Sequence, residues 1–243
     1  MKKNIFLLLV ALPLFNTVLA ADTESSSTVD YTTSSVKQAS NVCINYDFDI
    51  KLPVFSSDKI FDALNKKIQG QKDTVIGRVI SDGVLVKLGK VKPGKLINTV
   101  SSDYSVFQTD DVTSVVIHFT GYSAPYAHPF HVVTTDNFDQ KKQSFITLDS
   151  LFRSDVAIYK VLSQLTRDQL LKESVTDKEM MLSGTSPEAK NFKHWAFSEQ
   201  GITLYFDEAQ IAPYSDGQQV INISPKDLSG MLSDYGRSLF ALE

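Results

Sequence analysis

Histidine is the residue type in this sequence with the widest chemistry, because it can act as an acid, a base or a metal ligand near neutral pH. The chain has four: His118, His128, His131 and His194. A separation of three places His128 and His131 on opposite faces of a strand, and Pro129 prevents the helix that would bring them together. Neither the helical zinc-protease motif nor paired cysteines occur. We therefore expect no metal site and no cofactor.

Nucleophilic catalysis has no local motif in this chain. No serine stands in a Gly-x-Ser-x-Gly sequence, and the single cysteine, Cys43, has no adjacent histidine. A hydrolytic site would have to be assembled by the fold, from His128, Asp136 and a loop serine meeting in a cleft. The sequence thus assigns no catalytic residue and leaves a hydrolase as the alternative function.

One acid pair, Asp47 and Asp49, has the spacing of two residues on the same strand face. Apolar residues alternate with these acids from Tyr46 to Leu52, which predicts a half-buried strand. Lys51 continues the same spacing, so a basic residue lies on the strand face of the two acids. A solvated charged surface is therefore expected here, not a catalytic pair.

Two segments each display a tyrosine next to a proline. They are residues 122–129, YSAPYAHP, and residues 211–217, IAPYSDG. A phenol on a proline-stiffened loop is a good contact residue because little conformational entropy is lost on binding. The same tyrosines could instead tie loops to the sheet through their hydroxyl groups. The candidate partner-binding residues are Tyr122, Pro125, Tyr126, His128, Pro129, Pro213 and Tyr214.

The charge balance argues against a nucleic-acid partner. The chain has 243 residues, with 24 Lys plus Arg against 28 Asp plus Glu, a net charge of −4. Nucleic-acid binders are normally basic. Hydrophobic residues make up 42%, enough for a packed core. A single cysteine excludes an internal disulfide, and we expect a monomer.

The first twenty residues read as a secretory signal peptide. Lys2 and Lys3 precede an apolar run from Ile5 to Phe15, and small residues surround Ala20. This run is too short to span a bilayer, and no other run is long enough, so the protein is not expected to be membrane-spanning. Residues 21–41 are rich in Ser and Thr and predict a disordered tether. The expected location is the periplasm or the cell exterior.

Predicted strands and helices come in groups along the rest of the chain. A helix of about three turns is predicted between Ser57 and Gly70, and residues 74–98 favour a strand pair. Later strands are expected at 104–107, 113–119, 130–134, 144–148, 202–206 and 220–223, and helices at 158–170, 176–183 and 225–232. This grouping predicts an α+β fold: an antiparallel sheet with a long helix and a short closing helix, preceded by a small strand-helix module.

The segment Gly201–Gly217, GITLYFDEAQIAPYSDG, together with Val220–Ile223, resembles the C-terminal domain of the RsiV family. Asn137-Phe138-Asp139 and residues 147–152, TLDSLF, are similar to the same domain. The resemblance divides the chain into a small N-terminal module, residues 42–100, and an RsiV-like domain, residues 101–243. It implies an extracytoplasmic binding domain, which senses lysozyme in the anti-sigma factor and accompanies a catalytic domain in peptidoglycan deacetylases.

The sequence therefore predicts a secreted, non-catalytic binding protein of the bacterial envelope that recognises lysozyme or a cell-wall glycan. The alternative is an envelope hydrolase acting on peptidoglycan or another polysaccharide. Convergence of His128, Asp136 and a serine would favour the hydrolase. An exposed Pro-Tyr surface without that convergence would favour binding.

Overall fold

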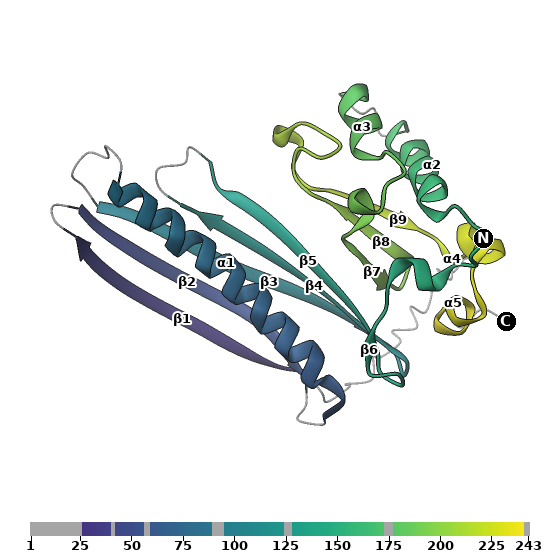
Figure 1. Ribbon diagram of the computed structural model, residues 1–243, viewed down its shortest axis with the longest axis horizontal. Coiled ribbons are helices and arrows are strands. Elements are labelled where there is room, and N and C mark those ends of the chain that lie inside the picture. Colours follow the sequence, from purple (N-terminus) through teal and green to yellow (C-terminus); the bar gives the residue numbers. More distant parts are fainter. Residues whose placement is uncertain are drawn as a thin grey trace, which may run out of the picture.

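The structure, a computed structural model, describes residues 26–39, 42–55, 59–88, 95–123, 128–172 and 177–240 (Figure 1). Side chains are described from Tyr46 onward, except for residues 83–88 and 95–97 within this set. The expected signal peptide, residues 1–20, lies outside these ranges. No helix in the described ranges is both long and apolar enough to cross a membrane.

Two sheets form the framework. The larger has the order β1-β2-β3-β4-β5-β6 and the smaller the order β7-β8-β9. All neighbouring strands are antiparallel except β2 and β3, which are parallel and joined through α1. The strands are β1 Ser26–Ala39, β2 Val42–Phe55, β3 Lys95–Gln108, β4 Val112–Tyr122, β5 Phe130–Asp139, β6 Ser144–Phe145, β7 Trp195–Ser198, β8 Gly201–Phe206 and β9 Gln219–Ile223. The predicted α+β class is confirmed.

One long helix and several short ones accompany the sheets. The α-helices are α1 Asp62–Leu88, α2 Ile158–Leu170, α3 Lys178–Gly184, α4 Pro225–Leu228 and α5 Asp234–Leu239. Short 3₁₀ turns occur at Lys59–Phe61, Leu148–Leu151, Ala189–Phe192, Tyr214–Asp216 and Ser229–Met231. Side chains of Asp177, Ser224 and Ser233 accept hydrogen bonds from the first turns of α3, α4 and α5. These capping bonds explain where the short helices begin.

The helix predicted between Ser57 and Gly70 is present from Asp62, but its predicted end and the strand pair predicted in residues 74–98 were wrong. The helix does not end at Gly70, and the expected strand pair in residues 74–98 is replaced by the second half of α1, with β3 starting at Lys95. The buried positions of α1 keep helical spacing past the glycine: Leu64, Ile68, Val75 and Val79. Tertiary packing of this apolar stripe outweighs the low helix propensity of Gly70 and Gly77.

The Ser/Thr-rich segment differs from its expected disorder over residues 26–39, which form β1. β1 pairs with β2 along its whole length, so the backbone groups that face β2 are satisfied without a large apolar content, while β1 itself is the edge strand of the sheet. Threonine and valine, which recur in this segment, favour extended backbone. The expected domain limit at residues 100–101 falls inside β3, whose two neighbours β2 and β4 belong to the same sheet.

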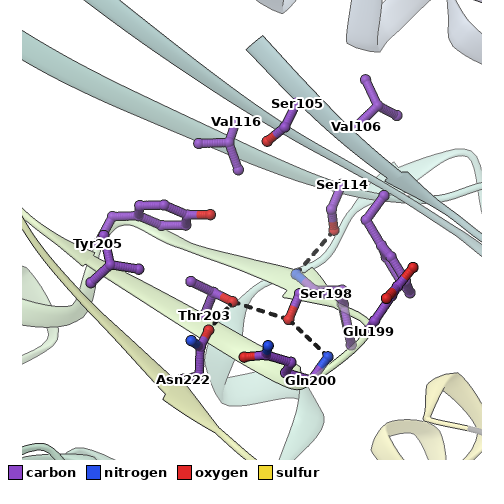
Figure 2. Close-up of a pocket in the computed structure, with 13 residues that line it drawn as sticks. Ser105, Val106, Ser114, Val116, Ser198, Glu199, Gln200, Thr203, Tyr205 and Asn222 are labelled. Atoms are coloured by element: carbon purple, nitrogen blue, oxygen red, sulfur yellow. Dashed lines mark hydrogen bonds between the residues drawn. The ribbon is translucent and has the colours of Figure 1, made fainter.

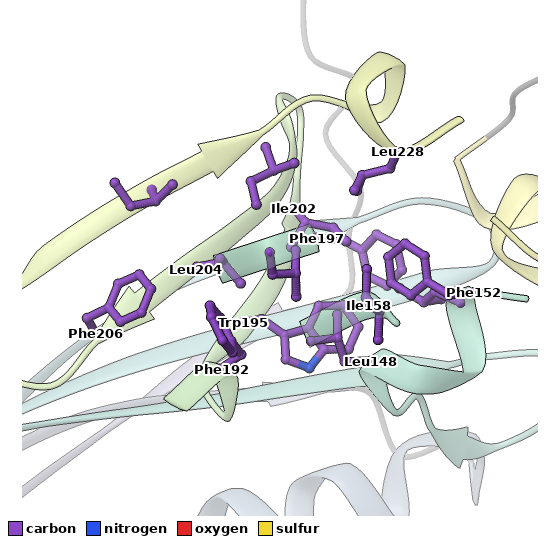
Figure 3. Close-up of a cluster of buried hydrophobic side chains, with 14 of the residues drawn as sticks. Leu148, Phe152, Ile158, Phe192, Trp195, Phe197, Ile202, Leu204, Phe206 and Leu228 are labelled. Atoms are coloured by element: carbon purple, nitrogen blue, oxygen red, sulfur yellow. The ribbon is translucent and has the colours of Figure 1, made fainter. Parts of the chain in front are cut away.

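The sheet has a buried face and a partly open face. α1 packs across the first face (Figure 1). There Leu64 and Ile68 join Ile117 and Phe119 in one hydrophobic cluster. Asp47, Asp49 and Lys51 lie on the other face and are exposed, as predicted for a solvated surface. A second hydrophobic cluster lies between the small sheet and α2, and includes Phe152, Ile158, Phe192, Trp195 and Leu204 (Figure 3).

The small sheet is attached to the open face of the large one through its edge strand, β7. Asn137 donates from Nδ2 to the Trp195 carbonyl oxygen at 2.8 Å, and its Oδ1 accepts from the Phe197 amide at 3.2 Å. The Ser114 hydroxyl lies 2.5 Å from Asn137 Oδ1 and also accepts from the Phe197 amide at 3.1 Å. Thr135 Oγ1 accepts from the Trp195 amide at 3.1 Å. Side chains of β4 and β5 thus satisfy the free edge of β7; we call this set of contacts the sheet junction.

Replacing Asn137 with alanine should lower the free energy of unfolding by about 2–3 kcal/mol, because buried backbone groups of β7 lose their partners. Urea unfolding of the variant measures this loss. Asn222→Ala is the matched control: Asn222 is exposed on β9, and its removal should cost less than about 1 kcal/mol. Equal losses in the two variants would contradict a special role for the junction.

Gly77→Ala should stabilise the protein by about 0.5–1 kcal/mol, since alanine restricts the unfolded chain and suits a helix interior. A Cβ at Gly77 would meet no atom within 4 Å. The control is Gly236→Ala in α5, where the Cβ would overlap the Leu151 carbonyl oxygen, so this second change should destabilise. Thermal unfolding should show a higher melting temperature for Gly77→Ala and a lower one for Gly236→Ala than for the wild type. A destabilised Gly77→Ala would argue against the continuous α1.

Candidate binding site

The two proline-tyrosine loops meet in space. The Tyr214 hydroxyl donates a hydrogen bond to the Pro129 carbonyl oxygen at 3.0 Å, although the two residues are 85 positions apart. The His128 ring lies next to the Tyr214 ring, with 5.9 Å between the centroids and a tilt of 44°. Tyr214 nevertheless stays 43% exposed. We call Pro213, Tyr214, His128 and Pro129 the Tyr214 surface.

The loop that carries Tyr214 is fixed to the core by the residues that precede the tyrosine. Ile211 and Ala212 are buried, and the Gln210 side chain donates to the carbonyl oxygens of Gly184 and Asn191, at 3.0 Å each. Gly217 closes the turn with a φ of 69°, a left-handed conformation that favours glycine. The tyrosine is therefore held in a fixed position on a loop whose base belongs to the core.

The other predicted contact residues fall into two groups. Tyr122 ends β4, is half-buried and pairs with Thr99 of β3. Pro125 and Tyr126 lie outside the described residues. The tie from Tyr214 to Pro129 corresponds to the structural role that the sequence left open for these tyrosines, and the exposure of Tyr214 is compatible with the contact role as well.

A small polar cluster borders this surface. His131 Nδ1 lies 3.0 Å from the Thr120 hydroxyl, and His131 Nε2 lies 3.7 Å from the Glu208 carboxylate. His128 and His131 thus have different neighbours, although His128 precedes β5 and the argument from opposite faces of a strand does not apply to it. Within the described residues, no group of three or more His, Cys, Asp or Glu side chains could hold a metal ion.

The groups of the alternative hydrolase do not converge in the described part of the chain. Asp136 is buried on the face covered by α1, where its carboxylate binds Lys67 Nζ at 2.6 Å and accepts from Gln71 Nε2 at 2.8 Å. The ring neighbour of His128 is Tyr214. Two α1 side chains occupy the position around Asp136 that a histidine base would need.

Sequence reasoning missed a cleft of about 450 Å³ between the two sheets (Figure 2). Ser105, Ser114 and Val116 line the wall formed by the large sheet, and Thr203, Tyr205 and Asn222 line the wall formed by the small one. Ser198, Glu199 and Gln200, at the turn between β7 and β8, lie at its end. These residues come from five strands, so no local motif joins them; only the alternation of Thr203 and Tyr205 on one strand hinted at a shared face.

Burial shifts the ionisation of the groups beside this cleft. Burial lowers the pKa of His118 from its ordinary value of 6.5, although Asp103 and Gln218 act in the opposite direction. Its ring meets the Tyr205 ring edge-on, with 5.9 Å between centroids. Burial also raises the pKa of the Tyr205 phenol, which therefore keeps its proton at neutral pH. His194 lies outside the cleft lining, where its carbonyl oxygen accepts from the Tyr205 amide, and its pKa is lowered by burial and by Lys193, against the attraction of Asp207.

Comparison with known proteins adds a family match for the C-terminal half. Residues 149–226 match the family DUF3298, described as a protein of unknown function. This stretch contains the Tyr214 loop and the three strands of the small sheet. The more specific RsiV family and its wider span, about residues 100–235, stay a prediction.

One relative and two solved structures match more of the chain. The peptidoglycan-N-acetylmuramic acid deacetylase PdaC of Bacillus subtilis (strain 168) is 29% identical over 197 residues, which are 78% of this chain and 39% of that protein. DUF3298 proteins of Bacteroides fragilis and Pseudomonas aeruginosa superpose with TM-scores of 0.61 and 0.54 at 18% and 15% identity. Each match covers 86% of this chain and 94% and 95% of the other, respectively. These structures establish the shared fold.

The depressed histidine pKa values predict a loss of stability in mild acid. A histidine with a lowered folded-state pKa binds fewer protons in the folded state than in the unfolded state, so stability falls as the pH drops below about 6.5. Urea unfolding at pH 7.5 and 5.5 should show this fall. His118→Gln, which cannot titrate, should lose less between the two pH values. An equal or larger loss in His118→Gln would contradict the assignment.

Proposed function

We propose that this chain is a non-catalytic, monomeric binding protein of the bacterial cell envelope, acting in the periplasm or outside the cell, and that it recognises lysozyme or a peptidoglycan-type glycan. The observation that carries the proposal is the Tyr214 surface. Tyr214 is exposed at 43%, and its hydroxyl is tied to Pro129. The ring is thus available to a partner and already ordered.

The Tyr214 surface is suited to binding because its side chains are ordered before a partner arrives. A side chain that is fixed in the free protein loses little rotamer entropy when a partner covers it. The ring offers a large apolar area, and the His128 ring beside it extends that area. Proline on either side, Pro129 and Pro213, restricts the backbone further. When a partner binds this surface, little of the favourable interaction energy is therefore offset by a loss of conformational entropy.

The relationship to PdaC supports a cell-wall setting. PdaC is named as a peptidoglycan deacetylase, and this chain aligns to 39% of its length. The deacetylase activity is a property of the whole relative, and the proposal takes from it only the association with peptidoglycan. The envelope hydrolase is the weaker candidate, because Asp136 is engaged by Lys67 and Gln71 on the covered face of the sheet.

Retention on immobilised lysozyme and on purified peptidoglycan tests the proposal. Tyr214→Ala should weaken binding to the true ligand about thirtyfold, which corresponds to ~2 kcal/mol for a central interface tyrosine. Tyr214→Phe keeps the ring but loses the bond to Pro129, and should weaken binding less.

Leu171→Ala is the matched control, since Leu171 is an exposed apolar residue, 58% accessible, at the end of α2. It should bind like the wild type. The proposal fails if wild-type protein is retained on neither material, or if Tyr214→Ala binds as tightly as Leu171→Ala. Retention on one material and not on the other identifies the ligand.

A further inference from the structure

We propose that the cleft between the two sheets is a saccharide-binding site for a neutral glycan chain that carries acetamido groups. The inference rests on the proposed function for the cell-wall setting of the ligand, and adds to it a second surface distinct from the Tyr214 surface. The cleft has a volume of about 450 Å³, within the range of small-molecule sites.

The polar groups of the cleft are fixed by one another. Thr203 Oγ1 donates to Asn222 Oδ1 at 2.8 Å and lies 3.0 Å from the Ser198 hydroxyl, which accepts from the Gln200 amide at 3.3 Å (Figure 2). Ser114, in the opposite wall, belongs to the sheet junction. The bond from Thr203 orients the Asn222 amide so that its Nδ2 donors remain for a ligand.

Several hydrogen-bonding groups of the cleft have no partner among the described residues. They are the Tyr205 hydroxyl, the Ser105 hydroxyl, the side-chain amide of Gln200 and the Glu199 carboxylate. Figure 2 shows the Tyr205 ring extending into the space between the walls. Because its phenol keeps its proton, Tyr205 can donate as well as accept. A ligand with many hydroxyl and amide groups would satisfy this set.

The apolar side chains and the charge of the cleft lining limit which chemical classes of ligand can bind there. Val116 and Val220 lie among the polar lining residues, where they can cover the methyl of an acetamido group and the C–H faces of a sugar. No lysine or arginine is among the described residues that line the cleft, and Glu199 contributes a negative charge. Phosphorylated or strongly acidic ligands are therefore disfavoured. A neutral acetamido sugar carries hydrogen-bond donors, hydrogen-bond acceptors and small apolar groups, and the cleft has lining residues that match each of these.

Calorimetric titration of the full chain with triacetylchitotriose tests the inference, with maltotriose as the comparison that lacks acetamido groups. Binding of the first and at least tenfold weaker binding of the second are expected. Tyr205→Phe, which removes one hydroxyl, should weaken binding threefold to tenfold. Ser105→Phe places a ring in the cleft and should weaken binding more than tenfold.

Ser101→Phe is the matched control for Ser105→Phe. Ser101 is exposed on the same face of β3, four residues away, and does not line the cleft. It should bind the saccharide like the wild type, and thermal unfolding should show that the three variants are folded. Equal binding of maltotriose would overturn the acetamido assignment, and unchanged binding by Ser105→Phe would overturn the site.

The outcomes also separate this inference from the proposed function. Wild-type protein that is retained on lysozyme or peptidoglycan but does not bind triacetylchitotriose overturns the saccharide cleft and leaves the proposed function standing. Wild-type protein that binds none of the three materials overturns both.

Discussion

The sheet junction is the interaction on which the rest of the structure depends. Edge strand β7 has backbone groups that face away from β8, and a buried group without a partner would cost about 1–3 kcal/mol. Ser114, Thr135 and Asn137 supply those partners from the middle of another sheet. Because these bonds are directional, they fix the position of the small sheet as well as its attachment. A purely apolar contact between the sheets would allow more than one arrangement.

Both candidate surfaces follow from that arrangement. The Tyr214 loop lies between β8 and β9, so it reaches Pro129 only if β7 is seated on β4 and β5 as observed. The cleft is the space left between the same two sheets. One surface is a raised, ordered aromatic contact and the other is a polar recess. Both surfaces depend on the same sheet junction but have different chemistry, which suits them to different parts of one ligand or to two ligands.

The sequence predicted the elements whose signals are local. The sequence located the strands at Ile202–Phe206 and Val220–Ile223, and helical spacing located α2. The sequence prediction failed at α1. Gly70 and the pair Asp82-Gly83 are local signals that end helices, whereas the buried apolar stripe that ends at Val79 stabilises the helix through tertiary packing. The cleft was beyond prediction since its residues belong to five strands. The sequence pointed to the two proline-tyrosine loops as candidate contact segments, but the partner of the Tyr214 hydroxyl, a backbone carbonyl, has no sequence signature.

The parallel pairing of β2 with β3 has a consequence for the order of folding. Cys43 is opposite Lys95, so this pairing closes a long loop that contains all of α1, whereas the β1–β2 and β3–β4 pairs join through short connections. Helices form in about a microsecond and local hairpins in microseconds, while non-local pairing is slow. The two hairpins and α1 would therefore form first as separate units. We expect the pairing of β2 with β3 to limit the folding rate, with α1 packing across both strands and connecting the two halves of the sheet.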